Sequence, residues 1–246
     1  MVLFMPMIRP LRLINSLLAP RFCVLCGAIV LFPDDYPLCT ACAEAILSQA
    51  NAMAPLDRCA SCGKPLISEH DRCTRCRVTT YGFDSAFPLF SYSGDVRLLI
   101  LAYKTGGRRS LAGLFAHLIA AVLVERYPGR ILVPVPPRPG KLRRKGWDQI
   151  EDIAKVLEHR YGFTVQRILV RSGDNQQKGL GLEARAANMR GTIRVECERK
   201  GRHPAIPENP VVLDDVFTTG ATLSACADVL KAAGSYRVDA ISIAAD

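Results

Sequence analysis

The sequence lacks any long uncharged apolar run. No stretch of about 18 apolar residues, the length that a membrane-spanning helix needs, is free of charge. Arg9 and Arg12 interrupt the apolar residues 1–20, and no small-residue cleavage site follows, so an export signal is not expected. Within this stretch, apolar side chains recur at helical spacing at Leu11, Ile14, Leu17 and Leu18. We therefore expect a soluble, cytoplasmic protein without stable membrane insertion, with an amphipathic helix in residues 1–20.

Extremes of composition are also absent. The chain has 246 residues, of which 49% are hydrophobic and 22% charged, as is typical of a globular protein. This length is enough for one sizeable α/β core and a smaller module. The formal net charge is +9. Eight cysteine thiolates that bind two zinc ions would reduce it to about +5, which leaves a moderately basic surface suited to phosphates or nucleic acid.

Eight of the ten cysteines form pairs separated by two residues. The pairs are Cys23/Cys26, Cys39/Cys42, Cys59/Cys62 and Cys73/Cys76. Two such pairs can surround one ion and complete a tetrahedral four-thiolate site, so the spacing predicts two zinc ions. Their role would be structural, because all four coordination positions are filled. Disulfides are disfavoured without an export signal, and iron–sulfur clusters because the spacings fit no common ferredoxin pattern. Thiols without a metal remain a third alternative.

The order in which the pairs combine can also be argued. Gly27 and Gly63 follow the first and third pairs, where a backbone turn around a metal favours a residue that tolerates positive φ. This favours two successive zinc ribbons within residues 21–80, although a cross-braced arrangement stays possible. So small a module has little core, and metal would supply much of its folding energy. The two remaining cysteines, Cys197 and Cys226, are expected to be ordinary buried residues. The four histidines are expected to be ordinary surface or core residues: His70, His117, His159 and His203.

Residues 81–246 show short apolar runs alternating with longer helical patterns. That alternation is typical of a parallel sheet with crossover helices, and proline and turn signals from Tyr81 to Pro88 mark its start. Strands are predicted at Ala86–Tyr92, Ile131–Val135, Thr164–Leu169, Val211–Asp214 and Val238–Ala244. Helices are predicted near Val96–Tyr103, Leu111–Tyr127, Trp147–Tyr161 and Ala221–Ala233. An open five-stranded α/β sheet of this kind binds ligands at the carboxyl ends of its strands.

One predicted strand end concentrates polar residues. Asp214 and Asp215 follow the apolar run that starts at Val211, and the small residues Thr218–Thr222 then turn into the next helix. A helix N-terminus of this kind offers N–H groups and hydroxyls to a phosphate. Two carboxylates would repel that phosphate unless they hold a ribose diol or a Mg²⁺-bearing diphosphate beside it. A chance strand–turn–helix is the alternative, and residue type, order and spacing all disfavour it.

The segment Val211–Thr222, VVLDDVFTTGAT, resembles the phosphoribosyl-diphosphate (PRPP) loop of type I phosphoribosyltransferases. This resemblance implies that Asp214 and Asp215 hold the ribose hydroxyls. The 5′-phosphate would then lie against Thr218, Thr219, Gly220, Ala221 and Thr222. The segments VPVPPRPGKLRRKGWDQ and LAYKTGGRRSLA, together with the cysteine pairs, resemble the competence protein F (ComF/GntX) family over nearly the whole chain.

The resemblance implies further site residues. Arg138 lies where these enzymes have their diphosphate loop, and Lys104 is another PRPP-binding candidate. Arg171–Arg190 corresponds to a mobile loop, in which Arg185 and Asn188 lie one helical turn apart. The catalytic candidates are accordingly Asp214, Asp215 and Arg185, acting on PRPP with Mg²⁺.

The chain also departs from the family pattern. Trp147 and Asp148 stand where relatives commonly have Phe-Asn, and Pro137 and Arg138 stand where they have Leu-His. An aspartate can only accept hydrogen bonds when ionised, which puts in doubt a ligand contact at Asp148.

The densest positive run is a candidate nucleic-acid surface. It comprises Lys141, Arg143, Arg144 and Lys145, and Trp147 follows it. A solvated face is the ordinary explanation for such a run, and a core anchor the ordinary role of such a tryptophan. The resemblance implies single-stranded DNA and DNA-uptake machinery as partners, because competence relatives are linked to the uptake and use of DNA.

Two functions fit these features. An enzyme would displace diphosphate from C1 of PRPP by an incoming acceptor, with catalysis from positioning, Mg²⁺ and a closed loop. Neither a nucleobase-binding segment nor a glutaminase half is evident in the sequence. A binding protein would instead use PRPP or a nucleic-acid 5′-phosphate as its ligand. We favour this second function, in a competence-type protein that handles DNA.

Overall fold

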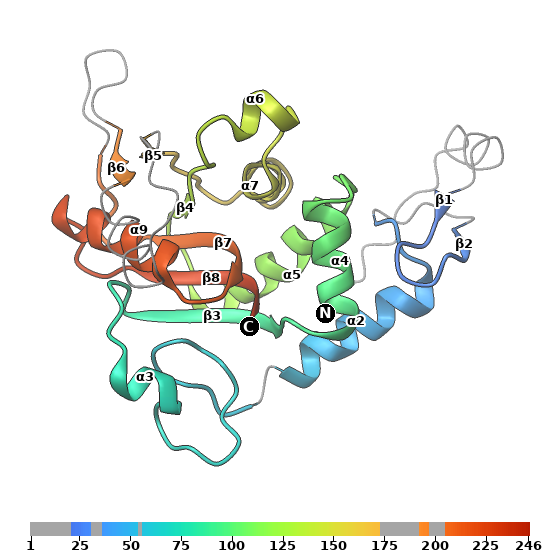
Figure 1. Cartoon of the computed structure of the whole chain (residues 1–246), viewed down its shortest axis with the longest axis horizontal. Helices are drawn as coiled ribbons and strands as arrows, with labels where there is room; N and C mark the ends of the chain where they lie inside the picture. Colours follow the sequence, from blue (N-terminus) through green and yellow to red (C-terminus); the bar gives the residue numbers. More distant parts are fainter. Residues whose placement is uncertain (1–20, 31–35, 54–55, 173–191, 197–204) are drawn as a thin grey trace, which may run out of the picture.

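The centre of the molecule is an open, parallel, four-stranded sheet. The computed structural model describes residues 21–30, 36–53, 56–172, 192–196 and 205–246. The strands follow the order β3-β8-β7-β4 (Figure 1). Their bounds are Ser85–Ser91 for β3, Leu132–Pro134 for β4, Val211–Phe217 for β7 and Asp239–Ala245 for β8. Every residue of β8 is buried, as expected of a central strand covered on both faces. The predicted α/β fold class is confirmed.

The predicted fifth strand, Thr164–Leu169, does not form as a full strand. Val165 makes a single parallel bridge to Leu132, and the Gln166 amide donates to the Leu132 carbonyl before the chain turns away. The end of this segment belongs to a separate antiparallel ribbon, in which β5 (Leu169–Arg171) pairs with β6 (Ile193–Val195). The main sheet therefore has four strands extended by one bridge.

Helices cover both faces of the sheet. Helices α4 (Gly94–Lys104), α5 (Leu111–Arg126) and α7 (Gln149–Tyr161) share a hydrophobic cluster with Leu213 of β7. Helix α9 (Ala221–Ala232) shares a second cluster with Val212, the preceding residue of that strand. Because neighbouring side chains of a strand point to opposite faces, the two clusters are the two sides of the sheet. The short helix α6 (Lys141–Lys145) has no buried residue.

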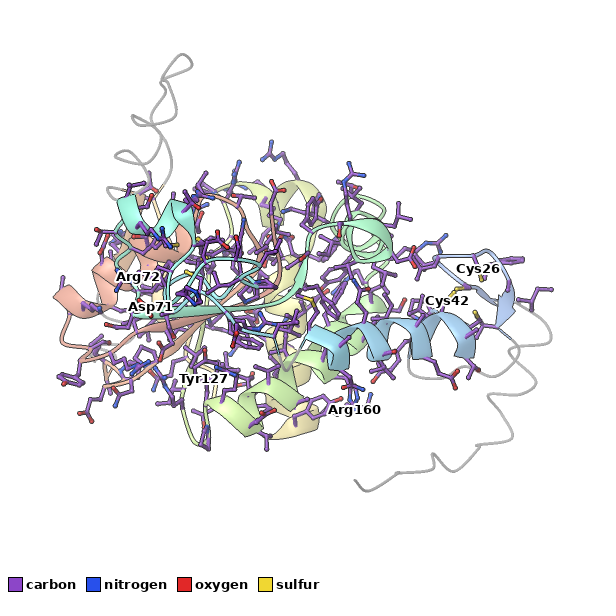
Figure 2. All side chains as sticks on the ribbon, turned by 90° about the horizontal axis from the view of Figure 1, so that it is seen from below. Cys26, Cys42, Asp71, Arg72, Tyr127 and Arg160 are labelled. Atoms are coloured by element: carbon purple, nitrogen blue, oxygen red, sulfur yellow. The ribbon has the colours of Figure 1, made fainter. Side chains whose placement is uncertain are left out.

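Cysteine-bearing segments lie at two separate places on this core. The first contains β1 (Arg21–Phe22) and β2 (Ile29–Val30), and the second contains α3 (Thr74–Val78). Helix α2 (Thr40–Met53), which the sequence analysis did not predict, runs between them along the molecule (Figure 1). Cys26 and Cys42 accordingly lie at one end of the molecule, and Asp71 and Arg72 of the second segment lie at the other (Figure 2).

The second cysteine segment packs directly on the edge strand β3. The Ala86 amide of β3 donates to the Ser61 carbonyl at 2.8 Å, and the Arg58 guanidinium donates to the Pro88 carbonyl at 2.8 Å. A Cβ atom on Gly63 would lie 2.1 Å from the Ala86 carbonyl oxygen, so only glycine permits this approach. This segment therefore occupies the hydrogen-bonding edge of β3.

A buried ionic cluster lies at the amino end of β8. Asp239 is fully buried, and it accepts hydrogen bonds from Ser85 at 2.7 Å, from Arg237 at 2.9 Å and from Arg130. Burial alone would favour the neutral acid, but the hydrogen bonds from Arg237 and Arg130 outweigh it and lower the pKa of Asp239. The cluster joins β3 and β8 to the segment before β4.

Within the described residues, no helix is long and apolar enough to cross a bilayer. The helix predicted in residues 1–20 lies outside the described residues.

Candidate functional site

A cavity of about 480 Å³ opens at the carboxyl ends of β4 and β7. This is the position at which open parallel sheets bind ligands. Among the residues that line it are Lys104, Arg138, Lys141, Lys145, Asp148, Gln149, Arg171, Asp214, Asp215, Thr218 and Thr222. They come from α4, α6, the start of α7, the ends of β4, β5 and β7, and the start of α9. The cavity thus gathers cations, carboxylates and hydroxyls from segments far apart in the sequence.

Asp215 is the more constrained of the two acidic residues. It is buried, and its Oδ2 atom accepts from the Lys104 ammonium at 2.9 Å and from the Gln149 side-chain amide at 2.7 Å. The Val216 amide donates to its Oδ1 atom at 2.7 Å. Strand β7 continues to Phe217, so both aspartates lie inside the strand. The sequence analysis predicted a strand that ends at Asp214, with the two aspartates at its tip.

Asp214 is half-buried and accepts a hydrogen bond from the Asp215 amide at 2.8 Å. Burial, together with the neighbouring charge of Asp215, raises its pKa to about 7, against the weaker opposing influence of Lys104 and Arg171. A carboxyl group with this pKa exchanges its proton near neutral pH, so its charge at the cavity depends on conditions and on the ligand.

The loop after β7 has the geometry of an anion site. Gly220 precedes α9 with a φ of +76°, and the first amides of α9 follow it. Thr218 and Thr222 line the cavity, whereas Thr219, Gly220 and Ala221 are not among its lining residues. A Cβ atom on Gly220 would lie 2.7 Å from Tyr81 Cε1 and 2.9 Å from Phe217 Cζ. Glycine is therefore required here both by the backbone conformation and by the aromatic side chains packed beside it.

The basic run divides between cavity and surface. Lys141 and Lys145 line the cavity, while Arg143 and Arg144 are exposed on α6. Trp147 is half-buried, and its ring centroid lies 5.4 Å from that of Tyr103. Its packing against the hydrophobic cluster supports the core-anchor interpretation over base stacking.

Asp148 has a structural explanation. Its carboxylate accepts from the amides of Ile150 at 2.9 Å and Glu151 at 3.1 Å, which caps the N-terminus of α7, and it also pairs with Lys141 at 2.5 Å. The spacing of Asp148 and Glu151 is that of a capping box, a signal present in the sequence. Gln149, which bonds Asp215, is a site residue that the sequence analysis did not identify.

The predicted mobile loop Arg171–Arg190 is described only at its start, where Arg171 ends β5 and lines the cavity. Its residues 173–190, which include Arg185 and Asn188, lie outside the described residues. The same holds for Cys197 and His203. Cys226 is buried, as predicted, and His70, His117 and His159 are exposed.

The eight paired cysteines form two four-sulfur groups. Cys23, Cys26, Cys39 and Cys42 make the first group, and Cys59, Cys62, Cys73 and Cys76 make the second. This is the successive pairing that the sequence analysis favoured. Sγ atoms are 3.6 Å apart between Cys26 and Cys39, and 3.7 Å apart between Cys62 and Cys73. Tetrahedral zinc with a Zn–S distance of about 2.3 Å places sulfurs about 3.8 Å apart, so the donor set fits zinc.

Local backbone structure explains the two kinds of cysteine pair. Gly27 and Gly63 have φ values of +74° and +68°, as predicted for turns around a metal. The other two pairs lie at the starts of α2 and α3, where no such glycine is needed. Burial opposes ionisation of Cys23, but hydrogen bonds from backbone amides, first that of Cys26, lower its pKa to about 6. At Cys23 the folded backbone thus favours the thiolate, which is the form that binds metal.

Comparisons with known proteins agree with the resemblance inferred from the motifs. No protein-family model matches the chain. The DNA utilization protein YhgH of Salmonella typhimurium is 27% identical over 231 residues, covering 90% of this chain and 96% of that protein. The competence protein ComFC of Streptococcus pneumoniae is 24% identical over 236 residues, covering 90% of this chain and 98% of that protein. ComFC of Bacillus subtilis is 23% identical, covering 84% of this chain and 83% of that protein.

Among solved structures, a hypoxanthine phosphoribosyltransferase from Staphylococcus aureus matches 55% of this chain and 62% of its own chain, with a TM-score of 0.32 and 14% identity.

Proposed function

We propose that this chain, a ComF-type protein with a phosphoribosyltransferase-like domain, binds PRPP in the cavity at the ends of β4 and β7 and acts in DNA utilisation. One observation carries the proposal: the cavity brings Asp214, Asp215 and the loop residues Thr218 and Thr222 together with the cations Lys104 and Arg138. The names of the relatives, which denote DNA utilization and competence proteins, support the second part.

Each part of PRPP would meet a complementary group. The 5′-phosphate would lie at the N-terminus of α9 against Thr218 and Thr222, where amides and hydroxyls can donate. The ribose hydroxyls would donate to the carboxylates of Asp214 and Asp215. Arg138 would then offset the charge of the diphosphate.

Lys104 would link the two halves of this site. Its ammonium pairs with Asp215 at 2.9 Å, and its side chain is 43% exposed, so it can also face a diphosphate in the cavity. Carboxylates are suitable oxygen ligands for Mg²⁺, which would neutralise diphosphate charge when bound. We place Mg²⁺ with PRPP rather than in a separate protein site.

PRPP binding is tested by titration calorimetry with Mg²⁺ and the zinc-loaded full chain. Asp215→Asn removes an anionic acceptor while preserving shape, and we expect affinity to fall at least about tenfold, with zinc content unchanged. Asp95→Asn is the matched control, because Asp95 is exposed in the first turn of the helix that carries Lys104. Retained affinity in Asp215→Asn would refute the site assignment.

For DNA, we propose that Arg143 and Arg144 contact the phosphates of a single strand. They are exposed on α6, beside the cavity mouth formed in part by Lys141 and Lys145. The double substitution Arg143→Ala/Arg144→Ala should lower affinity for a single-stranded oligonucleotide and flatten its salt dependence, by about 0.7 in logarithmic slope per lost contact. Arg97→Ala, which removes another exposed arginine, is the control. An unchanged slope in the double variant removes both residues from the interface.

An active phosphoribosyltransferase is the second candidate function. The raised pKa of Asp214 favours it, because such a carboxyl group can accept a proton near neutral pH. Release of diphosphate from PRPP, measured against bases, amines and single-stranded oligonucleotides, tests this activity. Diphosphate release that Asp214→Asn abolishes supports transfer, and no release with any acceptor favours the binding function.

We also keep the cytoplasmic location, the partnership with DNA-uptake machinery and the domain boundaries 1–20, 21–80 and 81–246 as proposals. Limited proteolysis of the zinc-loaded chain, followed by mass determination of the fragments, tests the boundaries.

A further inference from the structure

We propose that Arg75 is a positioning residue, through which the second cysteine group holds the loop Thr218–Gly220 in its phosphate-binding shape. The ligand part of this inference rests on the proposed function. The positioning part rests on contacts between two segments that are far apart in the sequence.

The first contact is a hydrogen bond across those segments. The Arg75 guanidinium donates through Nη1 to the Thr218 carbonyl oxygen at 2.9 Å. Arg75 lies between Cys73, which precedes α3, and Cys76, which is buried in it. A metal bound to both cysteines would fix the backbone on either side of Arg75.

The second contact lies at the other end of the loop. Tyr81, just beyond α3, stacks on Phe83 with centroids 4.7 Å apart and meets Phe217 edge-on at 5.8 Å. Its ring occupies the space that a side chain at position 220 would need, 2.7 Å from the Cβ position of Gly220. The polypeptide that carries the second cysteine group thus contacts both Thr218 and Gly220.

These contacts have a direct chemical consequence. A carbonyl oxygen that turned into the cavity would repel a phosphate, whereas amides and hydroxyls attract it. By holding the Thr218 carbonyl, Arg75 leaves the donors of the loop for the ligand. A hydrogen bond from a charged donor is strong enough to bias a short glycine-containing loop toward one conformation.

If Arg75 acted only as a charged surface residue, removing another exposed arginine of α3 would have the same effect. Arg77 provides the comparison, because it also belongs to α3, is exposed, and donates to the Arg72 carbonyl within its own segment. Arg77→Ala therefore removes a similar charge and a similar hydrogen bond without touching the loop.

The experiment compares wild type, Arg75→Ala, Arg75→Lys and Arg77→Ala as full-length, zinc-loaded chains. Amide hydrogen exchange at residues 218–222 is measured without ligand, and PRPP affinity is measured with Mg²⁺. We expect Arg75→Ala to exchange faster at the loop and to bind PRPP about tenfold more weakly, with two zinc ions retained. Arg75→Lys should recover part of both, and Arg77→Ala should resemble wild type.

The two readouts separate this inference from the proposed function. Unchanged loop exchange in Arg75→Ala overturns the positioning role. Faster exchange with unchanged PRPP affinity overturns the ligand part of the inference, because the loop order set by Arg75 would then not matter for binding. If wild type binds no PRPP, the proposed function fails, and the exchange data alone then decide whether Arg75 orders the loop. Equal effects of Arg75→Ala and Arg77→Ala would also overturn the inference, because they would show a general effect of charge.

Discussion

The substitution Gly220→Ala tests the packing beneath the loop Thr218–Gly220. Gly220 has a φ of +76°, and an alanine there adopts a left-handed conformation at a cost of about 1–2 kcal/mol. Its Cβ atom would also lie 2.7 Å from Tyr81 and 2.9 Å from Phe217. Tyr81 stacks on Phe83 and meets Phe217 edge-on, so a shift of either ring disturbs its neighbours, and overpacking adds about 1–3 kcal/mol.

Gly162 supplies the matched control. Its φ is +73°, and a Cβ atom there would meet no atom within 4 Å. Gly162→Ala should therefore lose only the conformational part, about 1–2 kcal/mol, and Gly220→Ala should lose about 2–5 kcal/mol in total. Urea unfolding of the zinc-loaded chain, followed by circular dichroism, measures both losses as shifts of the midpoint at constant slope.

A double variant isolates the steric part of the effect. Tyr81→Ala removes the nearest ring, so Gly220→Ala should cost less in that background than in wild type. Equal losses for Gly220→Ala and Gly162→Ala, or strict additivity with Tyr81→Ala, would refute the packing argument. A separate measurement compares the loss of PRPP binding free energy in Gly220→Ala with its loss of unfolding free energy. A smaller loss of binding free energy would show that the folded loop tolerates the added methyl group.

The other predictions concern metal, pH and the buried ionic cluster. Metal analysis should find two zinc ions per chain, and fewer would contradict the double ribbon. PRPP affinity should fall as pH decreases from about 8 to about 6, because the raised pKa of Asp214, about 7, lets that carboxylate gain a proton in this range and lose its acceptor role. In Asp214→Asn the part of the pH dependence that comes from this carboxyl group should vanish. A pH profile identical to that of wild type would show that Asp214 does not contact PRPP. Asp239→Asn should destabilise the chain by about 3–5 kcal/mol in urea unfolding, because Arg130 and Arg237 lose their counter-charge, and a loss below about 1 kcal/mol would contradict a paired buried charge.

Where a local pattern determines structure, the sequence was sufficient. The apolar run at Val211 forms β7, and the cysteine spacings form two separate four-sulfur groups. The predicted positive φ values of Gly27 and Gly63 are confirmed, because the tight turn at a metal knuckle is a local requirement.

Two local predictions were incomplete for different reasons. Helix α2 was not predicted because this segment was considered only for its metal ligand Cys42, although the alanine-rich TACAEAILSQANAM favours a helix. Thr164–Leu169 has strand-like composition, but a strand needs a partner along its length, and only Val165 meets β4. Composition could not reveal how soon the chain leaves the sheet.

In the candidate site, too, some residues are marked by a local sequence pattern and others are brought in only by tertiary packing. The loop Thr218–Thr222 and the preceding Asp214 and Asp215 lie in one continuous motif, so the sequence alone could mark them as candidates. Gln149 and Arg75 reach Asp215 and Thr218 only through tertiary packing across 66 and 143 residues. No local pattern marks such residues, and only the folded arrangement reveals them.

The position of the second cysteine group on β3 affects how strongly the protein tends to aggregate. An unprotected sheet edge can recruit strands from other chains, and the sequence of β3, SAFPLFS, is largely apolar. Ser61 and Arg58 occupy hydrogen-bonding positions along that edge. Zinc bound to the second cysteine group would hold this cover in place, so we expect metal-free chains to expose the edge. Insoluble assemblies would then be the expected fate of metal-free protein, and zinc supply would control how much of it accumulates in usable form.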